Sequence, residues 1–127
     1  MKVNHLIVGA TDVAASVKFY CDLFEFVASD DDPGTVGGKV LRGRDCDLLV
    51  LPFRTNLPNP NHFAFETDSI RFERIFERAA ELNLNPRAEP SRDSRSGFGE
   101  FQRGLRTYRN FYILDPSGTN VELMALV

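Results

Sequence analysis

The stretch FYILDPSGTNVE, residues 111–122, decides the fold of this chain. Its centre, Asp-Pro-Ser-Gly at residues 115–118, is typical of a tight turn, because proline fixes φ and glycine readily adopts the left-handed conformation. Apolar residues rich in β-branched and aromatic types lie on both sides of this turn. The pattern therefore predicts two strands, at residues 108–114 and 119–126, joined by the turn.

Each of these two predicted strands has one polar and one apolar face, because alternate residues of a strand point the same way. Glu122 shares its face with Asn120 and Met124, and the opposite face consists of apolar residues. In the strand before the turn, one face carries Tyr108, Asn110 and Tyr112, and the other carries Phe111 and Ile113. A sheet with so polar a face is expected to line a site.

The first half of the chain predicts a strand, a helix and three further strands. Residues 2–8 form the first strand, and a helix begins at Thr11-Asp12, where apolar side chains change to a spacing of three and four. The apolar stripe of this helix consists of Val13, Val17, Tyr20 and Phe24. Short strands are then expected at residues 26–29, 39–42 and 47–53.

The second half repeats this order after a proline-containing segment at residues 56–60, which can continue neither a helix nor a strand. A strand is expected at residues 62–67, followed by a helix capped by Asp68. A strand near residues 85–88 and an irregular stretch at residues 89–107 then precede the two strands around the turn.

The two halves also agree locally, since Asn4-His5 opens one half and Asn61-His62 opens the other. A Thr-Asp pair begins each predicted helix. We therefore interpret the chain as an internal duplication. It is expected to form one α+β domain over residues 1–127, with two βαβββ modules at about residues 1–55 and 61–127.

Composition excludes several classes of partner. The chain has 127 residues and a net charge of −3, which disfavours nucleic acid and anionic membranes as partners. No apolar run approaches the roughly 20 residues that cross a bilayer, and the N-terminal segment lacks the apolar stretch of a signal peptide. Cys21 and Cys46 form no CxxC motif and are expected to be reduced and partly buried. We expect a soluble cytoplasmic protein that binds a small molecule.

The two histidines of the chain, His5 and His62, occupy equivalent positions in the two halves. Glu122 lies between apolar neighbours, where a carboxylate is costly to bury unless it is paired or bound to a cation. Two imidazoles and one carboxylate suit Fe(II), Zn(II), Mn(II) or Ni(II), with coordination positions left for a substrate.

With these features the chain resembles the vicinal oxygen chelate superfamily, which includes glyoxalase I, fosfomycin and bleomycin resistance proteins, and extradiol dioxygenases. The resemblance covers nearly the whole chain and is most specific at residues 111–122. It implies a curved mixed sheet that forms a cupped metal site, with His5, His62 and Glu122 as the protein ligands of a divalent ion. Tyr112 would stand beside the substrate, where its hydroxyl hydrogen-bonds an oxygen bound to the metal.

Two departures from the superfamily's patterns narrow the function. Glyoxalase I has a fourth ligand on the last strand of its first half, where this chain has the apolar residues 48–51. Extradiol dioxygenases have an acid-base histidine before the tyrosine, and the corresponding region here contains Arg103. A conventional ring cleavage would therefore lack its proton donor.

Arg103 belongs to an arginine-rich stretch, residues 87–109, which holds six arginines and no lysine. An arginine fork suits a carboxylate, phosphonate or phosphate. A solvated loop whose arginines pair with the interleaved acidic residues Glu89, Asp93 and Glu100 is the alternative interpretation.

The leading hypothesis is a metal-dependent enzyme whose substrate chelates the ion through two neighbouring oxygens, so that the ion stabilises a developing oxyanion or enolate. Dioxygenase-like chemistry with Fe(II) is favoured, with Tyr112 and Arg103 at the reacting centre. One alternative is a metal-dependent lyase or thiol transferase acting on an anionic substrate, and another is a metal-free, drug-sequestering protein similar to bleomycin resistance proteins. A homodimer is expected, since such chains often complete each site with halves from two subunits.

Overall fold

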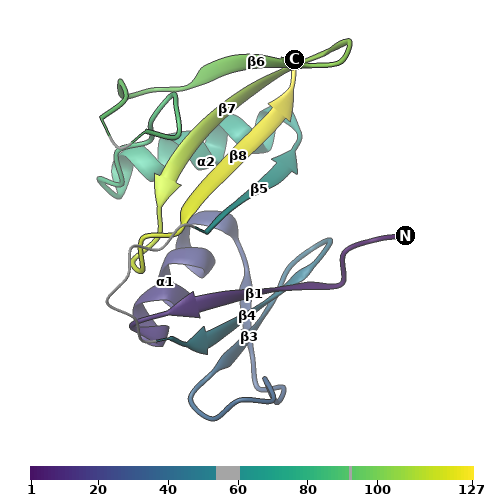
Figure 1. Ribbon diagram of the computed structural model, residues 1–127, viewed down its shortest axis with the longest axis vertical. Coiled ribbons are helices and arrows are strands. Elements are labelled where there is room, and N and C mark those ends of the chain that lie inside the picture. Colours follow the sequence, from purple (N-terminus) through teal and green to yellow (C-terminus); the bar gives the residue numbers. More distant parts are fainter. Residues whose placement is uncertain (54–60, 92) are drawn as a thin grey trace. The chain divides into compact units, whose positions relative to one another are not determined.

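The computed structural model describes residues 1–53, 61–91 and 93–127 of the chain (Figure 1). It consists of two compact units, of which unit 1 comprises residues 1–59 with 116–118 and unit 2 comprises residues 60–115 with 119–127. The expected boundary at residues 56–60 lies outside the described part of the chain.

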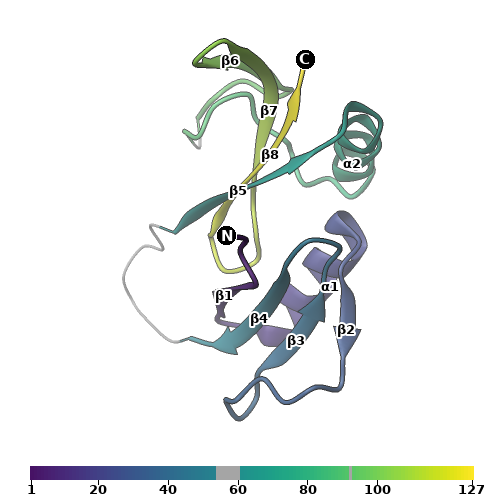
Figure 2. The same cartoon turned by 90° about the vertical axis from the view of Figure 1, so that its right-hand side faces the viewer.

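Unit 1 has the predicted order of strand, helix and three strands. Its elements are β1 (His5–Ala10), α1 (Val13–Phe24), β2 (Val27–Ser29), β3 (Lys39–Arg42) and β4 (Asp47–Pro52). The sheet order is β1-β4-β3-β2, with β1 parallel to β4 and the other pairs antiparallel. Figure 2 shows these four strands side by side, with α1 behind them.

Helix α1 begins where the sequence predicts, because the Asp12 side chain accepts a hydrogen bond from the Ala15 N–H at 3.0 Å. Its buried face includes Phe19, Tyr20 and Leu23 and packs against β3 and β4. The Phe19 and Tyr20 rings meet edge to face at 5.0 Å. Aromatic and aliphatic burial of this kind forms the core of unit 1.

Unit 2 repeats the same order of elements. They are β5 (His62–Thr67), α2 (Ser69–Glu81), β6 (Gly99–Arg103), β7 (Arg106–Leu114) and β8 (Asn120–Leu126). The sheet order is β5-β8-β7-β6, with β5 parallel to β8 and the other pairs antiparallel. The two mixed sheets confirm the predicted α+β fold of two βαβββ modules.

Helix α2 covers one face of this second sheet, and it lies behind β7 and β8 in the view of Figure 1. Asp68 caps the helix by accepting the Arg71 N–H at 2.8 Å. Phe72 packs edge to face against Phe111 with their ring centroids 5.2 Å apart. The faces of β7 and β8 that carry apolar residues therefore point toward α2.

The predicted strand near residues 85–88 is wrong. Only Arg87 forms isolated bridges there, to Ser96 and Tyr112, and the strand that follows α2 is β6, inside the stretch that was expected to be irregular. Asn83 and Asn85 have φ of 56° and 49°, which interrupts an extended chain before Arg87. Pairing with β7 makes β6 a strand, although its sequence lacks β-branched residues.

Two further features concern the cysteines and the helices. Cys21 and Cys46 are free and partly buried, as expected, and burial raises the pKa of both thiols. Among the described residues, no helix has the length and apolar character needed to cross a membrane.

Candidate functional site

The face of the second sheet opposite α2 carries a row of polar side chains. Glu122 on β8 is the register partner of Tyr112 on β7 and of Ala64 on β5. Register partners point to the same side of a sheet, so the side chains of Glu122 and Tyr112 are neighbours. Ala64 has a small side chain, so the strand β5 places no bulky group opposite the carboxylate.

Glu122 is a buried carboxylate, with only 7% of its surface exposed. Its Oε1 accepts a hydrogen bond from Nδ2 of Asn110 at 2.7 Å. Its Oε2 lies 3.3 Å from Nε2 of His62. A buried carboxylate is stable only with such partners, since leaving its charge uncompensated costs several kcal/mol.

His62 presents a defined nitrogen to this carboxylate. Its Nδ1 lies 2.8 Å from the backbone oxygen of Asn120, and because a carbonyl oxygen can only accept, Nδ1 carries a proton. In the neutral ring, Nε2 then has a lone pair directed at Glu122. Two electron-rich atoms at this distance are stable together when a cation lies between them, either a proton on Nε2 or a metal ion.

Tyr112 lies beside both groups. Its hydroxyl oxygen accepts a hydrogen bond from Nδ2 of Asn110 at 3.0 Å, and its ring centroid lies 5.8 Å from that of His62. Burial, then the charge of Glu122 and a hydrogen bond to it, raise the pKa of Tyr112 to about 12. The hydroxyl therefore keeps its proton at neutral pH and serves as a hydrogen-bond donor.

The His62–Glu122 pair has the geometry of two ligands of one ion. Ligand atoms about 2.1 Å from a metal lie about 3.0 to 3.4 Å from each other in octahedral or tetrahedral geometry. The observed 3.3 Å between Nε2 and Oε2 is within this range. Among the described residues, no group of three or more His, Cys, Asp and Glu side chains that could hold a metal occurs.

His5, the third predicted ligand, lies in unit 1 at the start of β1. Its side chain is exposed, and its Nδ1 lies 2.9 Å from Oδ1 of Asn4. It shares its face of β1 with Ile7, which is 64% exposed, whereas Val8 on the other face is buried. His5 therefore lies on the exposed face of β1, and its role as a ligand stays a prediction.

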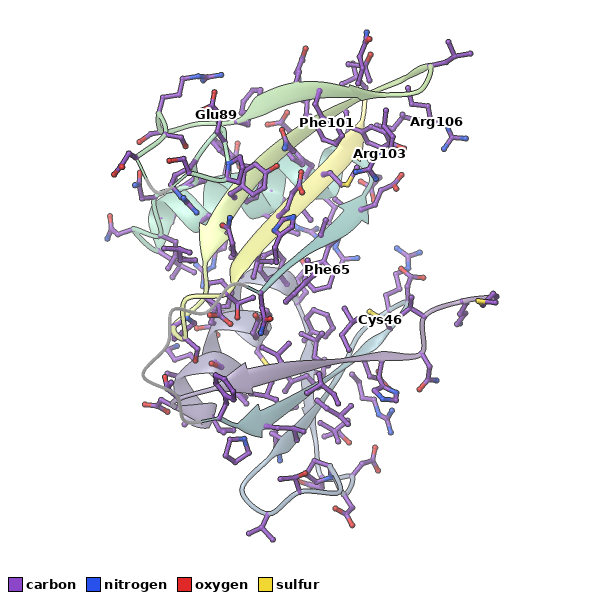
Figure 3. The ribbon with its side chains drawn as sticks, in the orientation of Figure 1. Cys46, Phe65, Glu89, Phe101, Arg103 and Arg106 are labelled. Atoms are coloured by element: carbon purple, nitrogen blue, oxygen red, sulfur yellow. The ribbon has the colours of Figure 1, made fainter. Side chains whose placement is uncertain are left out.

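Arg103 ends β6 at the hairpin that leads into β7. Its guanidinium carbon lies 5.6 Å from the ring centroid of Phe101, whose ring stacks on Tyr108 at 5.5 Å (Figure 3). The Arg103 charge lowers the pKa of Tyr112, against the larger effects that raise it. Arg103 is the register partner of Arg106, so two positive charges lie opposite each other at the end of the hairpin.

Other members of the arginine-rich stretch have structural roles. Arg87 is buried and donates to Asn120 Oδ1 at 2.8 Å and to the Ser91 carbonyl at 2.7 Å. Arg109 pairs with Glu73 on α2 at 2.6 Å. Arg92 lies outside the described residues. A solvated loop therefore does not describe all six arginines, because buried Arg87 links the loop to β8 through its hydrogen bonds to Ser91 and Asn120.

Sequence reasoning assigned no role to Asn110 or Arg87. Asn110 was placed on the polar face of its strand, two residues before Tyr112, and this spacing was the available signal for its contact with that hydroxyl. Arg87 gave no such signal, because its partners lie 33 residues away at Asn120 and in the adjacent loop.

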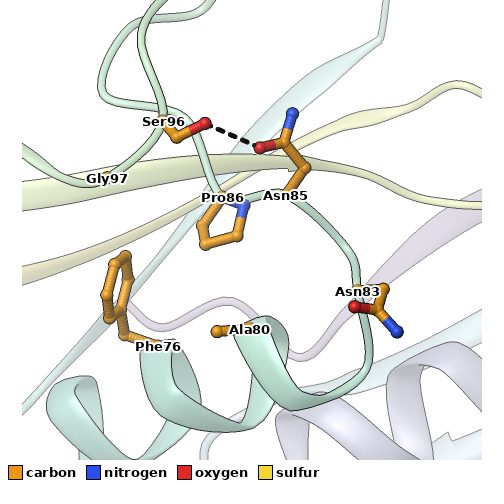
Figure 4. Close-up of a pocket in the computed structure, with 7 residues that line it drawn as sticks. All are labelled: Phe76, Ala80, Asn83, Asn85, Pro86, Ser96 and Gly97. Carbon is orange, nitrogen blue, oxygen red and sulfur yellow. Dashed lines mark hydrogen bonds between the residues drawn. The ribbon is translucent and has the colours of Figure 1, made fainter.

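Unit 2 also contains a cavity of about 370 Å³ between α2 and the loop that follows it (Figure 4). A hydrogen bond of 2.9 Å from the Ser96 hydroxyl to Asn85 Oδ1 lies at its rim. The cavity is lined by Phe76, Ala80, Asn83, Asn85, Pro86, Ser96 and Gly97. None of these residues belongs to the polar row described above.

Comparison with known proteins gives two findings. Among curated proteins there is no match. The solved structure titled "Oxidase ChaP-H2" is 26% identical with a TM-score of 0.79, over 98% of this chain and 93% of that chain. "Oxidase ChaP-H1" is also 26% identical, with a TM-score of 0.76 over 98% and 95% of the two chains.

A lactoylglutathione lyase from Agrobacterium tumefaciens has the same fold, at 19% identity and a TM-score of 0.70 over 96% of this chain and 91% of that chain. A protein-family model described as the Glyoxalase/Bleomycin resistance protein/Dioxygenase superfamily matches residues 2–123. The match extends from the strand that carries His5 to the strand that carries Glu122. The chain therefore belongs to the Glyoxalase/Bleomycin resistance protein/Dioxygenase superfamily.

Proposed function

We propose that this protein is a metal-dependent enzyme in which His62, Glu122 and His5 bind one divalent ion and a small-molecule substrate chelates that ion through two adjacent oxygens. Members of the family generally use a divalent metal and typically bind small molecules. The observation that carries the proposal is the orientation of His62, whose Nε2 lies 3.3 Å from Oε2 of a buried carboxylate.

The ligand set indicates the metal. Two imidazoles and one carboxylate suit Fe(II), and also Zn(II), Mn(II) or Ni(II), with positions left open for substrate. Bound there, the ion would act as a Lewis acid that polarises the substrate oxygens. The buried position of Glu122 supports this, because the ion offsets the cost of desolvating the carboxylate.

Dioxygenase-like chemistry with Fe(II) is the preferred reaction class. Two oxidases are similar to this chain over nearly its full length, at 26% identity. Tyr112 is assigned the role of hydrogen-bond donor to a substrate oxygen, because its raised pKa keeps the phenol protonated. With both histidines assigned to the metal and the Asn110 amide engaged by Glu122 and Tyr112, the Tyr112 hydroxyl is the donor assigned to the substrate.

A metal-dependent lyase or thiol transferase acting on an anionic substrate is the second candidate. Arg103 favours it, because its guanidinium is close enough to affect the pKa of Tyr112. A guanidinium binds carboxylate, phosphonate or phosphate oxygens in pairs. The same residue would also orient an anionic substrate for dioxygenase-like chemistry.

A metal-free sequestering protein is the third candidate, from a different functional class. Without a metal, only a proton could lie between Nε2 of His62 and the Glu122 carboxylate. The oriented pair argues for a metal enzyme over this alternative.

The three candidates are separated by one experiment. Protein purified without chelator is analysed for metals, then stripped, reloaded with Fe(II) under nitrogen and assayed with catechols and with small anionic substrates. Oxygen uptake that requires Fe(II) supports the preferred class, and metal-dependent turnover without oxygen uptake supports the second. Tight ligand binding with no bound metal and no turnover would overturn the enzyme proposal.

A further inference from the structure

We propose that Asn110 is a positioning residue of the metal site, whose side-chain amide holds Oε1 of Glu122 and the hydroxyl of Tyr112 so that Glu122 offers the single oxygen Oε2 to the ion. The proposal rests on the proposed function, because it concerns how the same site is assembled.

The Asn110 amide is placed between the two groups that it would orient. It is 5% exposed, and its Nδ2 lies 2.7 Å from Oε1 of Glu122 and 3.0 Å from the Tyr112 hydroxyl oxygen. A side-chain amide nitrogen carries two protons, which is one for each of these acceptors. Asn110 is therefore able to satisfy both contacts at the same time.

Gly99 on β6 leaves room for this amide. It is the register partner of Asn110. A Cβ at position 99 would lie 2.8 Å from the Ala88 carbonyl oxygen and 3.3 Å from Oδ1 of Asn110. Any side chain there would press on the carboxamide, so the glycine provides the space that Asn110 occupies.

The two oxygens of the Glu122 carboxylate have different partners. Oε1 is engaged by an N–H donor, whereas Oε2 lies beside Nε2 of His62. A carboxylate held in this way would bind an ion through one oxygen, because rotation to present both oxygens would break the bond to Asn110. Hydrogen bonding of a ligand carboxylate is a common way of fixing its orientation.

The same amide also orients Tyr112. When the phenol oxygen accepts a proton from Asn110, its own O–H must point toward another acceptor. In the structure that acceptor is Glu122. If Glu122 bound an ion, the O–H could turn toward a substrate oxygen.

Co(II) titration, followed by visible absorption, tests the proposal in the full-length protein. Asn110→Leu keeps the side-chain shape and removes both donors. It is expected to weaken Co(II) binding about 10- to 100-fold, the usual effect of losing a partner of a ligand, and to change the Co(II) spectrum. Asn110→Ser, a smaller polar variant, is expected to shift affinity in the same direction if the leucine variant folds poorly.

Thr107→Val is the matched control, because Thr107 lies on the same strand and its position in the alternation places it on the opposite face. Its Co(II) affinity and spectrum should equal those of wild type. In a Glu122→Gln background, Asn110→Leu should change the affinity less than twofold, since Asn110 acts through the carboxylate.

The outcomes separate this inference from the proposed function. Wild type that binds Co(II), with unchanged affinity and spectrum in Asn110→Leu, would overturn the positioning role and leave the metal site intact. An equal loss in the Glu122→Gln background would overturn it in favour of a purely structural role. Wild type that binds neither Co(II) nor Fe(II) would overturn the metal site and this inference together.

Discussion

The Nε2 atom of His62 lies 3.3 Å from Oε2 of Glu122, across two parallel strands that bring residues 60 positions apart into contact. The other nitrogen of the same ring faces the backbone oxygen of Asn120 at 2.8 Å. One strand thus fixes the direction of the imidazole and supplies the carboxylate that it meets. This arrangement is stable only with a positive charge between the two atoms, which is why a cation is central to the proposed function.

The origin of the third ligand gives the first prediction. We expect a homodimer in which His5 of one subunit joins His62 and Glu122 of the other. Mixing His5→Ala chains with His62→Ala chains should then restore up to one metal site per mixed dimer, although each variant alone binds poorly.

A mixture that binds no more metal than its components would show that all three ligands come from one chain. Light scattering on the same samples checks the dimer directly. A monomer that binds the ion tightly would also exclude a shared site.

Arg103 gives the second prediction, which concerns substrate charge. Its guanidinium stays charged near neutral pH, so it binds anions and does not relay protons. Arg103→Ala should weaken binding of small carboxylates or phosphonates to metal-loaded protein by about 1.5 to 3 kcal/mol, the usual value for hydrogen bonds to charged groups. Neutral catechols should be affected much less.

The measurement is a calorimetric titration with both ligand classes at fixed salt. Arg106→Ala is the matched control, because Arg106 lies opposite Arg103 in the hairpin and carries the same charge. An equal loss in both variants would mean that overall positive charge, and not a specific contact of Arg103, attracts the anion.

Arg87 gives the third prediction, which concerns stability. Its guanidinium is buried and donates to Asn120 Oδ1 and to the Ser91 carbonyl. Arg87→Met should lower the free energy of unfolding by about 2 to 3 kcal/mol, because buried acceptors lose charged donors. Urea unfolding measures the loss.

Arg78→Met is the control for Arg87→Met. Arg78 is 47% exposed and pairs with Glu81 on the surface of α2, so its replacement should cost less than about 0.5 kcal/mol. Equal urea midpoints for the two variants would show that the hydrogen bonds of Arg87 do not stabilise the loop.

Much of the fold was predictable from local pattern. Both helix starts follow from an aspartate that caps the first turn, and the strand faces around Glu122 follow from alternation. Strand β6 was missed because residues 99–103 have low intrinsic strand propensity and become a strand through pairing with β7. Local patterns do not encode such nonlocal pairing.

The candidate site was also predictable only in part. His62 was identified from the duplication and Glu122 from its place between apolar neighbours, whereas the role of Tyr112 came from the family resemblance. The structure brings these three together in unit 2. The contacts of Asn110 depend on the register of β7 against β8, in which Tyr112 lies opposite Glu122 and Asn110 lies opposite Met124. A register is set by the whole sheet, so its hydrogen bonds could not be read from one strand.

The assignment of His62 as a metal ligand is tested by the metal stoichiometry of wild type and of His62→Ala. Each protein is purified without chelator, loaded anaerobically with Fe(II), desalted and analysed for iron per chain. We expect one ion per wild-type chain and almost none in His62→Ala, with Cys21→Ser, a replacement on helix α1, retaining full occupancy. Full occupancy in His62→Ala would contradict the ligand assignment and, with it, the proposed metal centre.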